Sequence, residues 1–386
     1  MKSFVSHLEC SLCPKRFDDR EPVNVCSCGG SLLVRYDLAA ARREVDREAL
    51  AKRTSGQWRF FELMPLRSEA ALVTLGEGDT PMLDGGRLSK LLGVRQLWIK
   101  NEAVNPTGSF KDRGMSTAIS KANELGIQRV GVPTQGNAGS AAAAYGARAG
   151  MEVHVFMPRS TPRANIQEVA LAGARAYFVE GTIREAAAEM AKWKTELGFF
   201  DLSTLKEPYR VEGKKIMAYE IAEFFEWKLP NVLVFPTGGG TGVIGMWKAF
   251  QEMKAMGWIA DPLPKICVVQ SGGCAPLVAA YSKGAERCEA WPDPKTIATG
   301  LCVAKPYADH LVLKAVRESG GAVMAVSDKE IRESMNLLAN RAGVLACPEG
   351  AACIPAIRGL QGRGTLQTSD SVVIFNTAAM QKYWDS

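Results

Sequence analysis

The stretch Asn105-Pro106-Thr107-Gly108-Ser109-Phe110-Lys111-Asp112-Arg113-Gly114 carries one lysine directly after a Pro-Thr-Gly turn and ahead of a helical pattern. We expect Lys111 on the first turn of that helix, beside Arg113 and the positive end of the helix dipole. Both neighbours disfavour a further positive charge, so they lower the pKa of the Lys111 amine. A neutral amine is what a Schiff base requires, which makes Lys111 the candidate catalytic residue. A lysine in a turn is usually a solvated charge, so other segments must decide.

Short β-branched runs alternate with helical patterns from residue 96 onward. The expected strands are 96–100, 129–133, 152–157, 176–179, 231–235, 265–270 and 371–376. The expected helices are 114–125, 138–149, 163–172, 183–197, 212–225, 243–256, 329–342 and 350–360. This alternation predicts an α/β fold of doubly wound open parallel sheets with helices on both faces. Ligands bind such sheets at the carboxyl ends of the strands.

A glycine-rich loop, Gly238-Gly239-Gly240-Thr241-Gly242, follows the expected strand 231–235 and opens a helix. Glycines let successive backbone N–H groups turn inward, and the helix dipole adds attraction, so the loop predicts a phosphate site. Gly240-x-Gly242-x-x-Gly245 also matches the dinucleotide fingerprint, which favours an NAD-dependent oxidoreductase as an alternative. That fingerprint needs an acidic residue at the end of the next strand, where this chain has Gln270-Ser271.

Two further segments lie at expected strand ends. Thr134-Gln135-Gly136-Asn137-Ala138-Gly139-Ser140 starts a helix with free N–H groups, a hydroxyl and amides, which suits a carboxylate. Asn137 is placed to hydrogen-bond a cofactor phenolic oxygen. Thr377 follows the strand 371–376, and its hydroxyl opposite a pyridine nitrogen leaves that nitrogen largely unprotonated. Such a ring is a weak electron sink, which suits elimination and replacement better than transamination. With Lys111 and the glycine loop, these segments supply the parts of a pyridoxal phosphate site.

Composition excludes several function classes. The 386 residues are 47% hydrophobic and 23% charged, with a net charge of +6 and no dense basic run, so neither nucleic acid nor a membrane is an expected partner. Only three histidines occur, and they are far apart: His7, His154 and His310. They offer no catalytic triad and no His-ligated catalytic metal. Residues 1–17 have no uninterrupted apolar run, so we expect no signal peptide and a cytoplasmic protein.

Four of the ten cysteines form a group near the start of the chain. Cys10-x₂-Cys13 and Cys26-x-Cys28 are separated by twelve residues, and Gly29-Gly30 permits a tight turn. This spacing is typical of a zinc knuckle with tetrahedral Zn²⁺, although the Cys-x-Cys half is less usual. The alternative is a ribbon that holds no metal. The other six cysteines are scattered and read as small buried residues in a reducing compartment.

These segments together resemble the fold-type II pyridoxal phosphate enzymes, most closely the threonine synthase family. The resemblance runs from about Leu75 onward and includes three further segments. They are Leu75-Gly76-Glu77-Gly78-Asp79-Thr80-Pro81, Pro208-Tyr209-Arg210-Val211-Glu212-Gly213-Lys214-Lys215 and Pro348-Glu349-Gly350. The resemblance implies a knuckle over 1–35, a large cofactor domain over 36–113 and 205–386, and a small mobile substrate domain over 114–204. By analogy it also implies a homodimer.

In this family O-phospho-L-homoserine and water give L-threonine and phosphate. The resemblance implies that Lys111 carries the cofactor, that Thr134, Gln135, Gly136 and Ser140 bind the substrate, and that Arg210 binds its phosphate. This chain departs from the family where Gln135 and Ala138-Gly139 replace hydroxyl residues, and where Ala378-Ala379-Met380 replaces Gly-Ser-Gly. A β-eliminase or β-replacement enzyme of the same cofactor class therefore stays an alternative. So does a non-catalytic binding protein, in which Lys111 would be dispensable.

Overall fold

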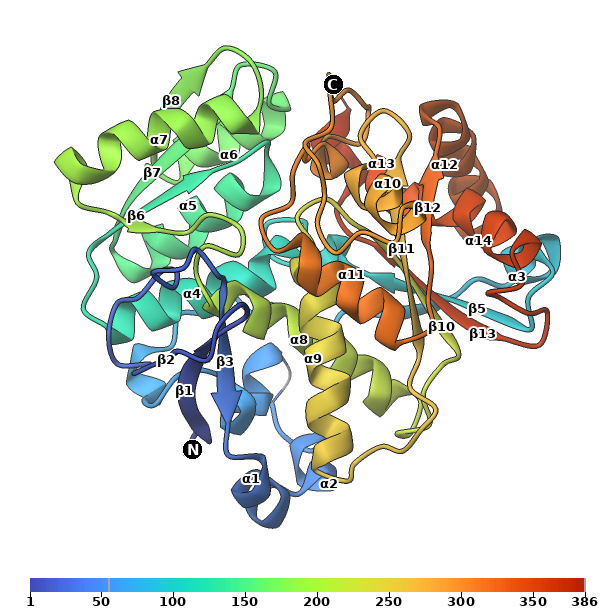
Figure 1. The fold of residues 1–386 in the computed structure, drawn as a ribbon, viewed down its shortest axis with the longest axis horizontal. Helices are drawn as coiled ribbons and strands as arrows, with labels where there is room; N and C mark the ends of the chain where they lie inside the picture. The colour runs from blue at the N-terminus through green and yellow to red at the C-terminus, as the bar shows by residue number, and fades with distance from the viewer. Residues whose placement is uncertain (55, 385–386) are drawn as a thin grey trace.

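The computed structural model describes residues 1–54 and 56–384, which build three separate β-sheets (Figure 1). The larger central sheet has the strand order β12-β11-β10-β13-β5-β4. Its strands are β4 (Met82–Asp84), β5 (Gln96–Asn101), β10 (Val232–Pro236), β11 (Lys265–Ser271), β12 (Val323–Val326) and β13 (Ser371–Asn376). All neighbours are parallel except β4, which pairs antiparallel with β5. The predicted open parallel sheet is confirmed, with an antiparallel edge strand and β12 added to it.

The smaller sheet has the order β8-β7-β6-β9 and is parallel throughout. Its strands are β6 (Arg129–Pro133), β7 (Glu152–Pro158), β8 (Arg175–Val179) and β9 (Phe200–Asp201). Val130, Val132, Val153 and Val155 are buried between this sheet and its helices. Buried β-branched runs of this kind are what a parallel sheet covered on both faces requires.

Helices cover both faces of the two parallel sheets (Figure 1). In the described chain they are α3 (Arg87–Leu92), α4 (Lys111–Glu124), α5 (Asn137–Ala149), α6 (Arg163–Leu171), α7 (Ile183–Leu197), α8 (Tyr209–Phe224), α9 (Thr241–Ala255), α10 (Pro276–Ser282), α11 (Asp309–Glu318), α12 (Asp328–Ala342), α13 (Pro348–Ala351) and α14 (Cys353–Gly362). Shorter 3₁₀ turns are η1 (Gln57–Leu63), η2 (Glu69–Ala71), η3 (Glu102–Val104), η4 (Thr299–Leu301) and η5 (Met380–Tyr383). The expected helix 350–360 was wrong as one element, because the chain breaks at Ala352 into α13 and α14.

The N-terminal segment forms a third, antiparallel sheet of order β2-β1-β3. It comprises β1 (Val5–Cys10), β2 (Arg16–Phe17) and β3 (Leu32–Tyr36), and α1 (Leu38–Glu44) and α2 (Arg47–Leu50) follow it. Figure 1 shows this blue segment beside α4 and α8, close to the smaller sheet. The Tyr36 hydroxyl at the end of β3 donates to Glu212 Oε2 of α8 at 2.7 Å, inside the protein. The knuckle is therefore attached to the body of the molecule by buried contacts.

Helices α8 and α9 are buried nearly all round, and their charges are paired inside the protein. Glu212 forms ion pairs with Lys215 Nζ at 2.8 Å and with Lys248 Nζ at 3.0 Å. Lys215 Nζ also forms an ion pair with Glu252 at 3.0 Å. Pairing offsets much of the cost of burying these charges. No helix in the described ranges 1–54 and 56–384 is long and apolar enough to cross a bilayer.

Candidate active site

A cavity of about 870 Å³ lies at the carboxyl ends of strands from both parallel sheets. It collects segments that follow β6, β10 and β13, as expected for parallel sheets. Eleven of the predicted site residues line it: Lys111, Thr134, Gln135, Gly136, Asn137, Gly238, Gly239, Gly240, Thr241, Gly242 and Thr377. Ser140 and Arg210 are buried and are not among its lining residues.

Lys111 is the first residue of α4, and the turn before it is fastened to the helix. The Thr107 N–H donates to Asp112 Oδ2 at 2.6 Å, and Gly108 adopts a φ of +69°. This positive φ favours glycine, because a Cβ there is strained. The turn therefore holds Lys111 at the helix start with its side chain on the cavity wall.

The pKa of Lys111 is lowered to about 8, mainly by burial and then by the charge of Arg210, while Glu349 and Cys347 oppose the shift. The predicted lowering of the Lys111 pKa is confirmed. The prediction that the charge of Arg113 contributes to it was wrong. Arg113 is fully buried and forms ion pairs with Glu102 at 2.6 Å and Glu220 at 2.6 Å. Its charge is neutralised by these two carboxylates, whereas Arg210 has no ion pair among the described residues.

The glycine loop is shaped to receive an anion. It follows β10 and opens α9 at Thr241, two residues before the expected start. A Cβ on Gly238 would lie 2.4 Å from Gly300 O, and one on Gly239 would lie 2.7 Å from Thr204 Cγ2. The first-turn N–H groups of α9 have no acceptor within the helix and are available to a ligand. These features fit the phosphate of pyridoxal phosphate.

The third glycine of the dinucleotide-like pattern has a packing role. A Cβ on Gly245 would lie 2.8 Å from Val211 O and 2.9 Å from Lys215 N, so Gly245 lets α9 approach α8. Gln270, where that fingerprint needs an acid, is buried and accepts from the Leu277 N–H at 2.8 Å. Gly245 therefore has a packing role, and Gln270 a hydrogen-bonding role, inside the protein.

Thr377 follows β13 and places its hydroxyl 3.5 Å from Cys347 Sγ, while its carbonyl accepts from the Phe110 N–H at 3.0 Å. That backbone bond ties the end of β13 to the residue before Lys111. A threonine and a buried thiol are uncharged donors, and burial raises the pKa of Cys347. The wall there fits a pyridine nitrogen that stays largely unprotonated.

The segment 134–140 crosses between β6 and α5 and contacts the opposite wall. With its side-chain amide oriented so that both atoms are satisfied, Gln135 Nε2 donates to Cys302 O at 2.9 Å and Thr299 O at 3.2 Å. The Gly136 N–H donates to Thr134 Oγ1 at 3.0 Å. The residue that departs from the family pattern thus joins the loop to η4 across the cavity.

Asn137 and Ser140 are held by one asparagine of α6. Asn165 Nδ2 donates to Asn137 Oδ1 at 3.0 Å and to Ser140 Oγ at 2.8 Å. Asn137 Nδ2 in turn donates to the Tyr383 hydroxyl at 3.0 Å. The Asn137 amide nitrogen is therefore oriented toward the cavity, which its side chain lines.

Arg210 lies behind the cavity wall, at the start of α8. Its Nη1 donates to Leu202 O at 2.7 Å and to Thr204 Oγ1 at 3.3 Å, and its Nε has no partner in the described part of the chain. Lys214, one turn along, donates to Phe110 O. Burial and the charges of Lys111 and Arg210 lower the pKa of Lys214. The basic side chains of Lys111, Arg210 and Lys214 are therefore gathered beside the cavity.

Several cavity residues had no assigned role from sequence. Glu349 is buried, accepts from the Gly300 N–H at 2.7 Å, and leaves Oε2 without a partner among the described residues. In the sequence, Glu349 follows Pro348 at a helix start, and this segment was identified only by its resemblance to the family. Tyr383, Lys206 and Tyr307 also line the cavity, and no sequence pattern marked them.

The four N-terminal cysteines converge on one point. Their Sγ atoms all lie within 4.8 Å of one another, with Cys10–Cys28 at 3.5 Å, Cys13–Cys26 at 3.6 Å and Cys13–Cys28 at 3.6 Å. Thiolates bound tetrahedrally to Zn²⁺ at about 2.3 Å are separated by about 3.8 Å. A Cβ on Gly30 would lie 2.5 Å from Cys10 Sγ, so only glycine fits there. The group can hold a metal ion.

Known proteins match this chain over most of its length. The family described as pyridoxal-phosphate dependent enzyme matches residues 73–378. Threonine synthase from Methanocaldococcus jannaschii is 35% identical over 95% of this chain and 91% of its own length. Threonine synthase from Methanosarcina acetivorans is 34% identical over 97% of this chain and 92% of its own length.

Solved structures share the fold. Maize serine racemase superposes with a TM-score of 0.68 at 20% identity, over 78% of this chain and 88% of that one. Diaminopropionate ammonia lyase from Escherichia coli superposes with a TM-score of 0.68 at 16% identity, over 81% of this chain and 89% of that one. The family match spans most of the chain, and the curated relatives span nearly all of it. The chain belongs to the pyridoxal-phosphate dependent enzymes, in the group that contains the threonine synthases.

Proposed function

We propose that this enzyme converts O-phospho-L-homoserine and water into L-threonine and inorganic phosphate. The observation that carries the proposal is the near full-length similarity to two threonine synthases, together with Lys111 at the wall of the shared cavity. In the balanced reaction, the Cγ–O bond to phosphate breaks, and water supplies the hydroxyl at Cβ and a proton.

Bound pyridoxal phosphate withdraws electrons from the substrate amino acid and so acidifies its Cα and Cβ protons. Lys111 would anchor the cofactor through its amine and then carry the proton at Cα, which its pKa of about 8 supports. The loop 238–242 would bind the cofactor phosphate, Asn137 its phenolic oxygen and Thr377 its ring nitrogen. These three assignments are supported by their common position on the cavity wall.

For the substrate, we assign its carboxylate to Thr134, Gln135, Gly136 and Ser140 on the helix-start segment. We assign its phosphate to Arg210, with Lys214 beside it. The buried Arg210 Nε, which lacks a partner among the described residues, supports this assignment. A guanidinium suits phosphate because its fork of donors is bidentate. Reaching Arg210 from the cavity requires Thr204 to give way, since Thr204 lines the wall and contacts Arg210 Nη1.

The two parallel sheets support the proposed division into a large cofactor domain (36–113 and 205–386) and a small substrate domain (114–204). Closure of the small domain would exclude water from the reacting atoms. We further propose Zn²⁺ at Cys10, Cys13, Cys26 and Cys28, which the sulfur spacing supports. A homodimer stays a prediction by analogy. All ten cysteines are unpaired, which supports the predicted cytoplasmic location.

Product analysis after incubation with O-phospho-L-homoserine tests the function. Equal yields of threonine and phosphate are expected. Phosphate without threonine, or untouched substrate with the cofactor still attached to Lys111, would contradict the proposal. Serine, threonine and other β-substituted alanines would be tried next. That second candidate, β-elimination or β-replacement, is favoured by Gln135 and Ala378-Ala379-Met380, where this chain departs from the threonine synthase pattern.

A further inference from the structure

The four-cysteine knuckle contacts two walls of the active-site cavity. On one side, Ser31 Oγ donates to Leu205 O at 2.7 Å, and Asn24 Nδ2 donates to Asp201 O at 2.8 Å and Lys206 O at 3.1 Å. On the other side, the Tyr307 hydroxyl donates to Gly29 O at 2.7 Å. Lys206 and Tyr307 both line the cavity, and Lys206 Nζ lies 5.4 Å from the centroid of the Tyr307 ring.

The segment 201–206, which contributes Ser203, Thr204 and Lys206 to the wall, accepts three hydrogen bonds from the knuckle. Leu205 is buried with a φ of +62°, a backbone conformation that is strained for a residue with a Cβ. Such a conformation persists only when its surroundings enforce it. The Ser31 hydroxyl on Leu205 O is one such restraint, and Asn24 restrains the residues on both sides of it.

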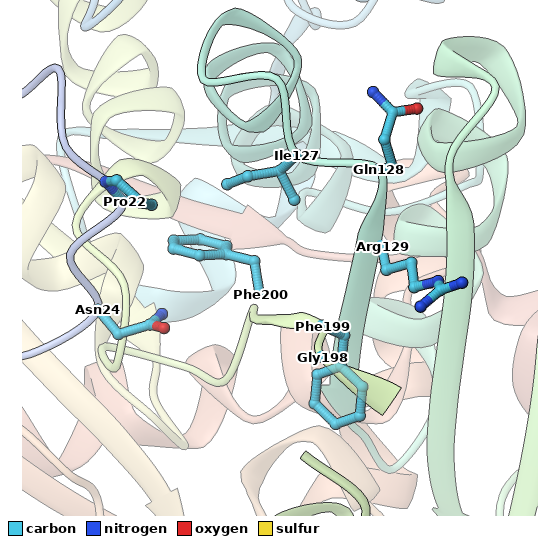
Figure 2. A pocket seen from close by; sticks show the side chains of 8 residues that line it. All are labelled: Pro22, Asn24, Ile127, Gln128, Arg129, Gly198, Phe199 and Phe200. Carbon is cyan, nitrogen blue, oxygen red and sulfur yellow. The ribbon is translucent and has the colours of Figure 1, made fainter. Parts of the chain in front are cut away.

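Figure 2 shows Asn24 and Pro22 of the knuckle facing Phe200 across a second hollow of about 520 Å³. Beside this hollow, the side-chain amide of Asn24 reaches from the knuckle to Asp201 O of β9. The knuckle and the smaller sheet also share a buried hydrophobic cluster, in which Cys26 and Leu32 lie with Phe200. The directed hydrogen bonds add to that packing.

The held segment leads directly to the proposed phosphate-binding residue. Arg210 Nη1 is positioned by Leu202 O and Thr204 Oγ1, which flank Ser203 within the same segment. Ser203, Thr204 and Lys206 line the cavity. A shift of the Leu205 turn would therefore move the acceptors of Arg210 and the side chains beside it.

The restraining groups lie among the cysteines. Ser31 is three residues after Cys28, and its carbonyl accepts from the Ser11 N–H at 2.9 Å, next to Cys10. The Gly29 N–H donates to Cys26 O at 2.8 Å. Small metal-bound units are commonly unfolded without their metal, so metal loss would release these groups.

We infer that the metal-bound knuckle is a positioning element of the active site, which holds the Leu205 turn and Tyr307 so that Arg210, Thr204 and Lys206 receive the anionic end of the substrate. Asn24 and Ser31 are its positioning residues. The substrate part of this inference rests on the proposed function, whereas the structural coupling does not.

The test compares Ser31→Ala with Ser27→Ala in the cofactor-loaded enzyme. Ser27 is in the same knuckle, but its hydroxyl accepts from exposed Lys15 at 2.7 Å and does not contact the cavity wall. We expect Ser31→Ala to weaken binding of inorganic phosphate by about three- to tenfold, the effect of one hydrogen bond. Hydrogen exchange of the amides of 202–210 should accelerate, while the visible absorbance of the bound cofactor stays unchanged.

Metal removal from the wild-type holoenzyme by a chelator should reproduce both effects, and added Zn²⁺ should reverse them. Equal phosphate affinity and equal exchange in Ser31→Ala and Ser27→Ala would overturn the inference. Full activity of an enzyme from which dialysis has removed all Zn²⁺ would also overturn the inference. Should Ser31→Ala fail to fold, Asn24→Ala tests the same segment. Because hydrogen exchange needs no substrate, accelerated exchange in an enzyme that makes no threonine supports the coupling and refutes only the proposed function.

Discussion

The side-chain amide of Asn137 donates a 3.0 Å hydrogen bond to the Tyr383 hydroxyl, which joins the first residue of α5 to the C-terminal turn η5. Asn165 holds the amide oxygen, so the nitrogen of Asn137 is fixed toward the cavity. An oriented N–H donor is what a cofactor phenolic oxygen requires. The two ends of this contact come from residues 246 positions apart in the chain.

Asn137→Asp replaces this donor with a negatively charged acceptor. We expect cofactor affinity to fall about tenfold or more, because a donor to the phenolic oxygen is lost and a repulsive charge replaces it. Titration of the apoenzyme with pyridoxal phosphate measures the change. Asn123→Asp is the matched control, since Asn123 donates to Ala71 O far from the cavity. Equal affinities in the two variants would contradict the role of Asn137.

Lys111→Ala removes the amine that anchors the cofactor and carries the substrate proton. Turnover should fall by at least about 10³-fold, in line with the loss of a covalent anchor and proton carrier. The cofactor should no longer be attached covalently, which borohydride reduction and mass spectrometry detect. The circular dichroism spectrum should be unchanged, and Lys90→Ala on α3 serves as control. Normal turnover in Lys111→Ala would exclude Lys111 as the catalytic residue.

The pKa of Lys111, lowered to about 8, predicts how fast the apoenzyme reacts with an aldehyde. Only the neutral amine reacts, so the rate should rise about tenfold from pH 6 to 7 and level off above about pH 8. A free lysine continues to rise toward its pKa of about 10.4. Arg210→Gln removes a positive charge that lowers this pKa, so the midpoint should move to higher pH. A midpoint unaffected by Arg210→Gln would leave burial as the sole cause.

Gly239→Ala adds a Cβ to the glycine loop between β10 and α9. The new Cβ would lie 2.7 Å from Thr204 Cγ2, so the loop must shift away from its present shape. We expect cofactor affinity to fall about tenfold, because displaced N–H groups no longer converge on the phosphate. The control is Gly362→Ala on α14, where a Cβ meets nothing within 4 Å. Comparable cofactor affinity in both variants would show that the loop does not bind the phosphate.

Glu220→Gln tests the buried network that positions α4. Glu220 accepts from Arg113 Nη1 at 2.6 Å and Lys100 Nζ at 2.6 Å, and these charges hold its pKa below the usual range. Removing one partner of a buried pair costs about 3–5 kcal/mol of unfolding free energy. Urea unfolding should show that loss, against about 1 kcal/mol for Glu223→Gln, whose partner Arg59 it meets nearer the surface. Equal losses would mean that burial of the network does not matter.

The local pattern of the chain determined much of the fold and of the cofactor-facing wall. Strands such as Arg129–Pro133 and Ser371–Asn376 and the helix Ile183–Leu197 have the bounds expected from sequence. The cavity-lining positions of Lys111, Gly238 and Thr377 follow from the same rule, because parallel strands present their carboxyl ends on one edge. Sequence also predicted the convergence of the four cysteines, since their spacing brings them together within one short segment.

Only the tertiary structure decided which distant groups meet. Arg113, adjacent in sequence to the site, is neutralised by Glu102 and Glu220, whereas Arg210 acts on Lys111 from α8. The bond from Ser31 to Leu205 joins residues 174 positions apart, and no local pattern contains it. Periodicity and turn chemistry are properties of neighbours along the chain, so they predict elements and their ends. Charge interactions and hydrogen bonds act through space, so packing alone determines their partners.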